Sequence, residues 1–154
     1  MYGPEFEKKV DQIVARYPQP KAALLPVLWA VQREQGWVGL ASEEWVGKRL
    51  GVSPAHVHGA VTFYTMFKQK PSGKYHIQVC TTLSCMLRGS DELVDHLCER
   101  LRIRPGETTP DGKFSLVCVE CLGSCDTAPM FQLNDDYHEN LTTAAVDRLL
   151  ERLP

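Results

Sequence analysis

Two closely spaced pairs of cysteines constrain this chain more than any other feature of its sequence. Cys80 and Cys85 are separated by four residues, and Cys121 and Cys125 are separated by three. Each pair follows a segment rich in β-forming residues, and a predicted helix lies between the pairs. If the two segments are strands, their ends can present both cysteine loops at one point in space. The pattern therefore predicts a site in which four thiolates hold a metal.

The length of the chain limits what these cysteines do. With 154 residues it can bury a hydrophobic core and does not need disulfides to fold. No basic segment followed by an apolar stretch resembles a secretion signal, and the longest apolar run falls short of the ~18 residues of a membrane span. We therefore expect a cytoplasmic protein with no direct membrane insertion. In that compartment its six cysteines serve as metal ligands, redox groups or buried apolar side chains.

The charge distribution argues against nucleic acid as a partner. The formal net charge is −2 at pH 7, and lysine and arginine form no cluster along the sequence. The chain also contains neither a G-x-G-x-x-G motif nor a Walker motif, so it has no fingerprint of a nucleotide-binding site.

The first part of the chain has the periodicity of helices. Apolar residues recur at helical spacing in four segments that proline, glycine or serine delimits. The predicted helices cover residues 5–17, 22–35, 42–50 and 53–64. Ser42 and Ser53 are the expected N-caps of the last two, and Tyr64 is expected to face the core. Residues 1–70 are thus predicted to form a helical domain that docks on a partner.

A polar segment at residues 68–73 marks the change from helical to strand periodicity. The elements predicted after it are a strand at 75–80, a helix capped by Ser90, a loop at 104–113, a strand at 114–120, a hairpin around residues 134–136 and a helix opened by Thr142. The order is βαββα with one more possible strand, and it predicts a compact α/β sandwich over residues 71–154.

The two remaining cysteines are predicted to be structural. Cys98 lies on the apolar stripe of a helix, where free cysteine usually behaves as a small hydrophobic residue. Cys118 alternates with Phe114 and Leu116 along a strand, so we expect its side chain to face the core. Cys118 and Cys121 also form C-x-x-C, a spacing found in redox and zinc sites. A strand that continues past Cys118 argues against that pairing.

Spacing alone leaves more than one chemistry open for the four cysteines. Structural zinc accepts C-x4-C and C-x3-C, so the spacing does not exclude it. Iron–sulfur chemistry is favoured because both loops contain small or hydroxyl-bearing residues whose N–H and O–H groups can approach bridging sulfides. These residues are Thr81, Thr82, Ser84, Gly123 and Ser124. Dithiol redox chemistry and unpaired structural cysteines are the remaining alternatives.

Longer stretches around the cysteines resemble a known family. The runs Gly73–Cys85, Gly106–Gly112 and Val119–Met130 are similar to the thioredoxin-like [2Fe–2S] subunit of NADH:quinone oxidoreductase, respiratory complex I. Leu28–Trp37 and Val61–Tyr64 are similar to the helical domain of that family. The resemblance therefore covers nearly the whole chain.

The resemblance implies an N-terminal helical bundle followed by a thioredoxin-like α/β domain. It implies that Cys80, Cys85, Cys121 and Cys125 hold one [2Fe–2S] cluster. The partner would be a flavoprotein subunit that binds FMN and takes hydride from NADH, with further iron–sulfur subunits in the peripheral arm of the complex. Similar subunits also serve NAD-linked formate dehydrogenases and NAD-reducing hydrogenases. Thioredoxin-like folds often have a cis-proline near the position of Pro129, which the sequence position alone does not decide.

Overall fold

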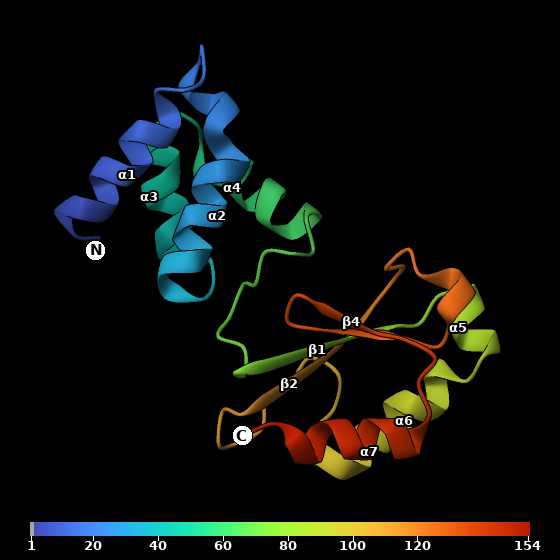
Figure 1. Ribbon diagram of the computed structural model, residues 1–154. Coiled ribbons are helices and arrows are strands. Elements are labelled where there is room, and N and C mark those ends of the chain that lie inside the picture. Colours follow the sequence, from blue (N-terminus) through green and yellow to red (C-terminus); the bar gives the residue numbers. More distant parts are fainter. Residues whose placement is uncertain (1) are drawn as a thin grey trace. The chain divides into compact units, whose positions relative to one another are not determined.

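The computed structural model describes residues 2–154, which form two compact units (Figure 1). One unit ends at Pro71, and the other spans Ser72–Pro154. The first is helical, and the second combines helices with a four-stranded sheet. None of the helices in residues 2–154 combines the length and hydrophobicity that a bilayer span requires. The α/β fold class predicted from the sequence, with a helical part before a mixed domain, is confirmed.

The helical unit is built from amphipathic helices that share one core. Their bounds are α1 Pro4–Val14, η1 Pro20–Ala23, α2 Leu24–Gln35, α3 Leu40–Leu50 and α4 Pro54–Phe63. The core combines the apolar faces of these helices, and its fully buried members include Val10, Val27, Leu28, Val46 and Val57. Pro26 lies in the first turn of α2, where a proline removes no helical hydrogen bond.

The helix that the sequence predicts to end at Gly36 does so, whereas two others end earlier than predicted. Gly36 ends α2 in the left-handed conformation with φ 89°, a conformation that glycine adopts without steric cost. α1 ends at Val14, three residues before the predicted boundary. α4 ends at Phe63, and the backbone of Tyr64 is extended. The Tyr64 side chain is 36% exposed, so the prediction that it faces the core is wrong.

Two of the predicted N-caps are confirmed. The Ser53 side chain accepts a hydrogen bond from the His56 N–H at 3.2 Å, and Pro54 follows as the first residue of α4. The Thr142 hydroxyl accepts from the Ala145 N–H at 3.2 Å in the same way. Both bonds satisfy one of the amide groups that a helix start leaves without a partner.

The predicted N-caps Ser42 and Ser90 are wrong. Both residues lie inside their helices, because Gly39 and Gly89 occupy the cap positions. Ser42 is buried, and its hydroxyl accepts a hydrogen bond from the Tyr2 hydroxyl at 3.0 Å. In α3 the serine therefore serves a tertiary contact and not the local cap that the sequence predicts.

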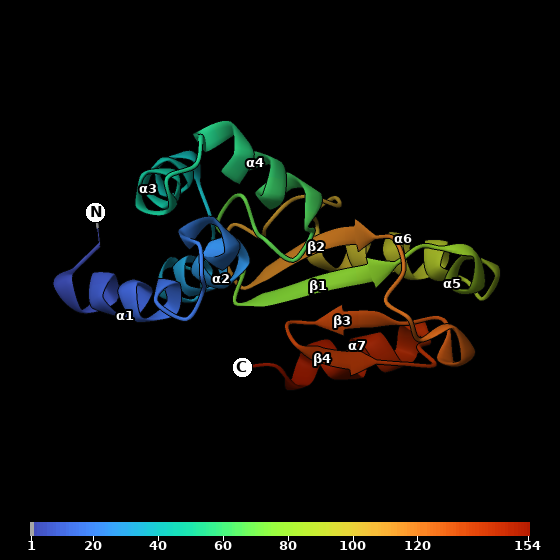
Figure 2. The same ribbon diagram turned by 90° about the horizontal axis from the view of Figure 1, so that it is seen from above.

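The second unit is a mixed sheet with helices packed on one of its faces. Its elements are β1 Tyr75–Cys80, α5 Leu83–Leu87, α6 Ser90–Leu101, β2 Phe114–Val119, η2 Cys125–Thr127, β3 Phe131–Leu133, β4 Asp136–His138 and α7 Thr143–Arg152. The strand order is β2-β1-β3-β4; β1 is parallel to β2 and antiparallel to β3, which forms a hairpin with β4. Figures 1 and 2 show α6 and α7 on the same face of the sheet.

The core of the second unit lies between the sheet and the two long helices. Its fully buried side chains are Ile77, Val79, Leu97, Leu116, Phe131 and Val146. On the outer side of the helices, Arg100 of α6 donates to Asp147 of α7 at 3.1 Å. Apolar burial therefore supplies the packing, while this exposed ion pair adds little to stability.

The two cysteines predicted to be structural differ in their burial. Cys98 is partly buried and packs against the core of the second unit. Cys118 is exposed, so the prediction that it is a buried core residue is wrong, although it pairs with the fully buried Val79 of β1. β2 is an edge strand, and the backbone of residues 106–109 bonds to its first half, for example from Leu116 N–H to Glu107 O at 3.1 Å. The alternation of apolar residues predicts which face of β2 points toward the core, but it does not predict how far along β2 that face is buried.

Gly73 lies close against the backbone of β2. A Cβ at this residue would lie 2.5 Å from the carbonyl carbon of Phe114 and 2.7 Å from the amide nitrogen of Ser115. Because both are backbone atoms of a paired strand, we expect Gly73→Ala to lower the free energy of unfolding by about 1–3 kcal/mol. Urea denaturation measures this change.

Gly59→Ala is the control for that substitution, because a Cβ at Gly59 meets nothing within 4 Å. It should leave stability unchanged or raise it slightly, since alanine favours the helix. A Gly73→Ala variant as stable as the original chain would contradict the close approach of Gly73 to β2.

Candidate metal centre

The parallel pairing of β1 with β2 places both cysteine segments at one edge of the sheet. Cys80 is the last residue of β1 and pairs with Val119, the last residue of β2. The Thr81 N–H and hydroxyl both donate to the Val119 carbonyl, at 3.1 and 3.2 Å. The Thr82 hydroxyl donates to the Glu120 carbonyl at 2.5 Å. The two segments are therefore tied together directly beyond the strand ends.

Cys80 and Cys85 form the buried side of the site. Cys85 lies in α5, a five-residue helix that was not predicted from the sequence. The two residues are 3% and 2% exposed. With Ala128 and Met130 they form a small apolar cluster, against which Leu122 packs. The first cysteine pair is thus held together in a region shielded from water.

The surroundings shift the pKa values of these two thiols in opposite directions. Burial raises the pKa of Cys85 to about 11, and the hydrogen bond with Cys80 and the charge of Cys125 add to this rise. Burial also acts to raise the pKa of Cys80. Hydrogen bonds from the Thr82 hydroxyl and from the Thr82 and Leu122 backbone outweigh it, and the pKa of Cys80 is lowered. Cys80 is therefore the more easily ionised thiol of the pair.

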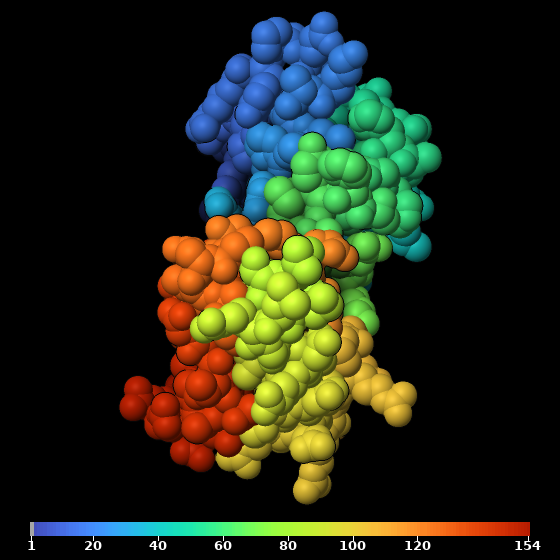
Figure 3. All heavy atoms as spheres, turned by 90° about the vertical axis from the view of Figure 1, so that its right-hand side faces the viewer, coloured from blue at the N-terminus to red at the C-terminus, as the bar shows by residue number. Residues whose placement is uncertain are grey.

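Cys121 and Cys125 lie on an exposed segment beyond β2. Cys125 begins η2, which contacts α5, and Figure 3 shows the orange segment around η2 beside the yellow-green segment around α5. The Cys121 sulfur accepts a hydrogen bond from the Gly123 N–H at 3.4 Å. Gly123 has φ 79°, so the turn between the two cysteines uses a conformation that favours glycine.

The four cysteines reach one region of the protein, but their side chains are not gathered in one shell. Cys80 and Cys85 belong to one buried cluster, whereas Cys121 and Cys125 are exposed. Within residues 2–154, no three His, Cys, Asp or Glu side chains are close enough together to hold a metal ion. The donor set itself fits an iron–sulfur cluster, because it consists of four thiols on two linked segments, with the Gly123 N–H directed at the Cys121 sulfur.

Two side chains from the β3–β4 hairpin region hold the second cysteine segment, a role that no sequence pattern indicated. The Tyr137 hydroxyl donates to the Leu122 carbonyl at 2.6 Å. The Glu139 carboxylate accepts from the hydroxyls of Ser124 and Thr127. These two hydrogen bonds lower the pKa of Glu139, and the bond from Ser124 has the larger effect. No local pattern could have found them, because they join residues 12 to 15 positions apart.

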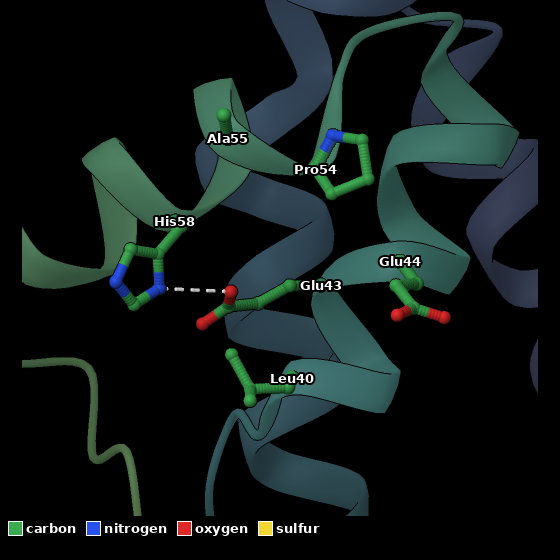
Figure 4. Close-up of a pocket in the computed structure, with 6 residues that line it drawn as sticks. All are labelled: Leu40, Glu43, Glu44, Pro54, Ala55 and His58. Atoms are coloured by element: carbon green, nitrogen blue, oxygen red, sulfur yellow. Dashed lines mark hydrogen bonds and ion pairs between the residues drawn. The ribbon is translucent and has the colours of Figure 1, made fainter.

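A separate pocket of about 280 Å³ lies between α3 and α4 in the helical unit (Figure 4). In it the Oε2 atom of Glu43 lies 2.9 Å from Nδ1 of His58. The Glu43 side chain is only 4% exposed, and a buried carboxylate requires such a partner. We therefore assign this pair a structural role in joining α3 to α4.

The second unit has the architecture of a thioredoxin-like domain. A parallel strand pair is extended by an antiparallel hairpin, and the two long helices pack on one face of the sheet. The Ala128–Pro129 peptide bond beside the cysteine site is cis. Residues 10–154 match the thioredoxin-like [2Fe-2S] ferredoxin family, and the chain belongs to this family. The resemblance seen in the sequence is thereby confirmed.

Individual relatives extend over most of the chain. It is 47% identical to NADH-quinone oxidoreductase subunit 2 of Thermus thermophilus, over 96% of this chain and 85% of the relative. It is 46% identical to the E 2 subunit of NADH-quinone oxidoreductase from Rhizobium meliloti (strain 1021), over 95% of this chain and 87% of the relative. An air-oxidised NAD+-reducing [NiFe]-hydrogenase structure is similar at 25% identity and a TM-score of 0.70, over 82% of this chain and 22% of that chain.

Proposed function

We propose that this chain is an electron-transfer subunit of a complex I-type NADH-quinone oxidoreductase and carries one [2Fe–2S] cluster. The proposed ligands are Cys80, Cys85, Cys121 and Cys125. The observation that carries the proposal is the position of these cysteines at the adjoining ends of two parallel strands in a thioredoxin-like [2Fe-2S] ferredoxin domain. The names of relatives that match along most of their length support the choice of complex.

The residues around the cysteines have complementary roles in this proposal. A [2Fe–2S] cluster, when bound, supplies one-electron redox chemistry. The four thiolates would attach it to the chain, and the Gly123 N–H provides a hydrogen bond to the Cys121 sulfur. Such donors, together with solvent exposure, tune the potential of a cluster. Ala128 and Met130 keep water from the Cys80 side of the site.

The proposed neighbour is a flavoprotein subunit that holds FMN and binds NAD(H), with further iron–sulfur subunits beyond it. The surface of α5 supports a contact beside the cysteines. Leu83, Met86 and Leu87 are 64%, 46% and 74% exposed, although all three are large and apolar. Contiguous apolar surface of this kind is typical of protein contacts. In such a complex the chain would lie in the cytoplasmic peripheral arm.

The helical unit is proposed to dock on the same assembly. It exposes the large apolar side chains Leu40, Phe63 and Met66, which are 71%, 76% and 41% accessible. Its own core is separate from that of the second unit. The helices therefore do not need to support the cysteine site, and assembly is the role that their exposed apolar surface favours.

A fragment that spans Ser72–Pro154 tests this division of roles. It contains all four cysteines and a complete core, so we expect it to fold and to take up the cluster. Its affinity for the flavoprotein subunit should be lower than that of the full chain by about tenfold or more, because the docking surface of the helices is absent. Co-purification and titration calorimetry measure this difference. Equal affinities for fragment and full chain would assign the helices another role.

The fold similarity to an NAD+-reducing hydrogenase supports a second host complex, and an NAD-dependent formate dehydrogenase is a third. Affinity purification of the tagged chain from its own cells separates these hosts. We expect the other subunits of a quinone reductase to co-purify, and hydrogenase or formate dehydrogenase subunits would redirect the proposal. A zinc-stabilised interaction module is the alternative of another class, and such a protein would be colourless and contain zinc instead of iron.

A further inference from the structure

We propose that Tyr137 and Glu139 are positioning residues that hold the Cys121–Cys125 segment in the arrangement that binds the cluster. This inference rests on the proposed cluster site and extends it to side chains from a different part of the chain. Both residues act through the segment between the cysteines, Tyr137 on Leu122 and Glu139 on Ser124.

The two contacts lie on either side of the turn between the cysteines. Only Leu122, Gly123 and Ser124 separate the second cysteine pair. Tyr137 holds the Leu122 carbonyl at 2.6 Å, and Glu139 accepts the Ser124 hydroxyl. The left-handed glycine lies between the two held residues. The turn between the two cysteines is therefore held at two points.

Glu139 also holds the far end of η2, which begins at Cys125. Its carboxylate accepts the Thr127 hydroxyl at 2.7 Å, and the neighbouring Asn140 N–H donates to the Thr127 carbonyl at 2.8 Å. The Ser124 and Thr127 hydroxyls are themselves 2.7 Å apart. A single carboxylate thus bridges residues on both sides of Cys125, and hydrogen bonds to a charged acceptor are stronger than neutral ones.

The segment needs such support because it belongs to no strand and both of its cysteines are exposed. Ordering a free loop when a ligand binds costs conformational entropy, whereas a loop already held in place avoids much of that cost. Tyr137 pairs with Gln132 in the hairpin, so the support comes from the sheet. The hairpin therefore holds the segment that carries the second pair of cysteines.

The test uses the full chain loaded with its cluster. Bleaching of the cluster by an iron chelator should be about three- to tenfold faster in Tyr137→Phe and in Glu139→Ala, in line with the loss of one or two hydrogen bonds. The EPR line shape of the reduced cluster should change in both. Glu139→Gln keeps an acceptor oxygen and should restore most of the original rate. Asp136→Ala removes an exposed carboxylate from the same strand as Tyr137 and should behave as the original chain.

The pairing of Ser124 with Glu139 is tested by a double-mutant cycle. Each single variant raises the bleaching rate by some factor. If Glu139 acts through Ser124, the double variant Ser124→Ala/Glu139→Ala should raise the rate by clearly less than the product of the two single factors. Hydrogen exchange in residues 121–127 of the cluster-free chain should accelerate in Glu139→Ala and not in Asp136→Ala.

Bleaching rates and EPR spectra equal to those of the original chain in both Tyr137→Phe and Glu139→Ala would overturn the inference, and so would fully multiplicative effects in the cycle. A failure of the original chain to take up any cluster would instead overturn the proposed function. The two failures are therefore distinguishable in the same set of proteins.

Discussion

Replacement of any one of Cys80, Cys85, Cys121 and Cys125 by serine is expected to reduce bound iron and sulfide by about tenfold or more, because thiolate ligation attaches the cluster. The four variants should be affected alike although their surroundings differ. The first two residues are buried and the other two are exposed. Iron and sulfide analysis after anaerobic reconstitution measures the loss.

Cys98→Ser and Cys118→Ser are the matched controls, since each removes one thiol from the same domain. Both should keep the full cluster content. Cys98 is partly buried, so its hydroxyl replacement should cost about 1 kcal/mol of stability. The exposed Cys118 should tolerate serine within about 0.5 kcal/mol. Loss of the cluster in Cys118→Ser, with retention in Cys125→Ser, would show that the ligands are assigned incorrectly.

The second large effect is the expected inability of the isolated chain to oxidise NADH even when it is loaded with a cluster. Hydride transfer delivers two electrons together, whereas a [2Fe–2S] centre ordinarily takes one. A flavin must therefore stand between them, and the chain has no dinucleotide-binding fingerprint. The near-ultraviolet absorbance of NADH should stay constant with the isolated chain and fall only when the flavoprotein subunit and an electron acceptor are present.

The flavoprotein subunit without this chain is the control for that experiment. Rapid-freeze EPR of the pair shows whether NADH alone reduces the binuclear centre or whether dithionite is needed. Reduction by NADH alone indicates that the cluster takes part in electron flow from the flavin. A need for dithionite indicates a cluster of low potential that lies beside the main electron route. NADH oxidation by this chain, with flavin rigorously absent, would contradict the proposed division of labour.

Local signals predicted the elements of this fold where short-range physics determines them. Ser53 with Pro54, Thr142 and Gly36 each satisfy backbone requirements within one turn, and the structure places helix ends at these residues. α5 escaped prediction because five residues are too few to show helical periodicity. The sequence does not reveal the role of Ser42, because its hydroxyl contacts Tyr2, which is far away in the sequence.

Local signals also predicted part of the candidate site. Alternating apolar residues and the turn residues that follow them predict that the first strand ends at Cys80 and that the second leads toward Cys121. The exposure of Cys118 depends on how far residues 106–109 cover the edge of β2, and the support from Glu139 depends on the folded hairpin. Such tertiary relations have no local signature in a single sequence.

The most direct test is the composition and spectrum of the original chain, purified anaerobically at full length. A [2Fe–2S] protein should be brown-red and contain iron and acid-labile sulfide in equal amounts, about two of each per chain. On reduction with dithionite it should bleach and show the EPR signal of a single unpaired electron shared by two irons. A colourless protein that contains zinc, or one that binds no metal after reconstitution, would contradict the proposed function.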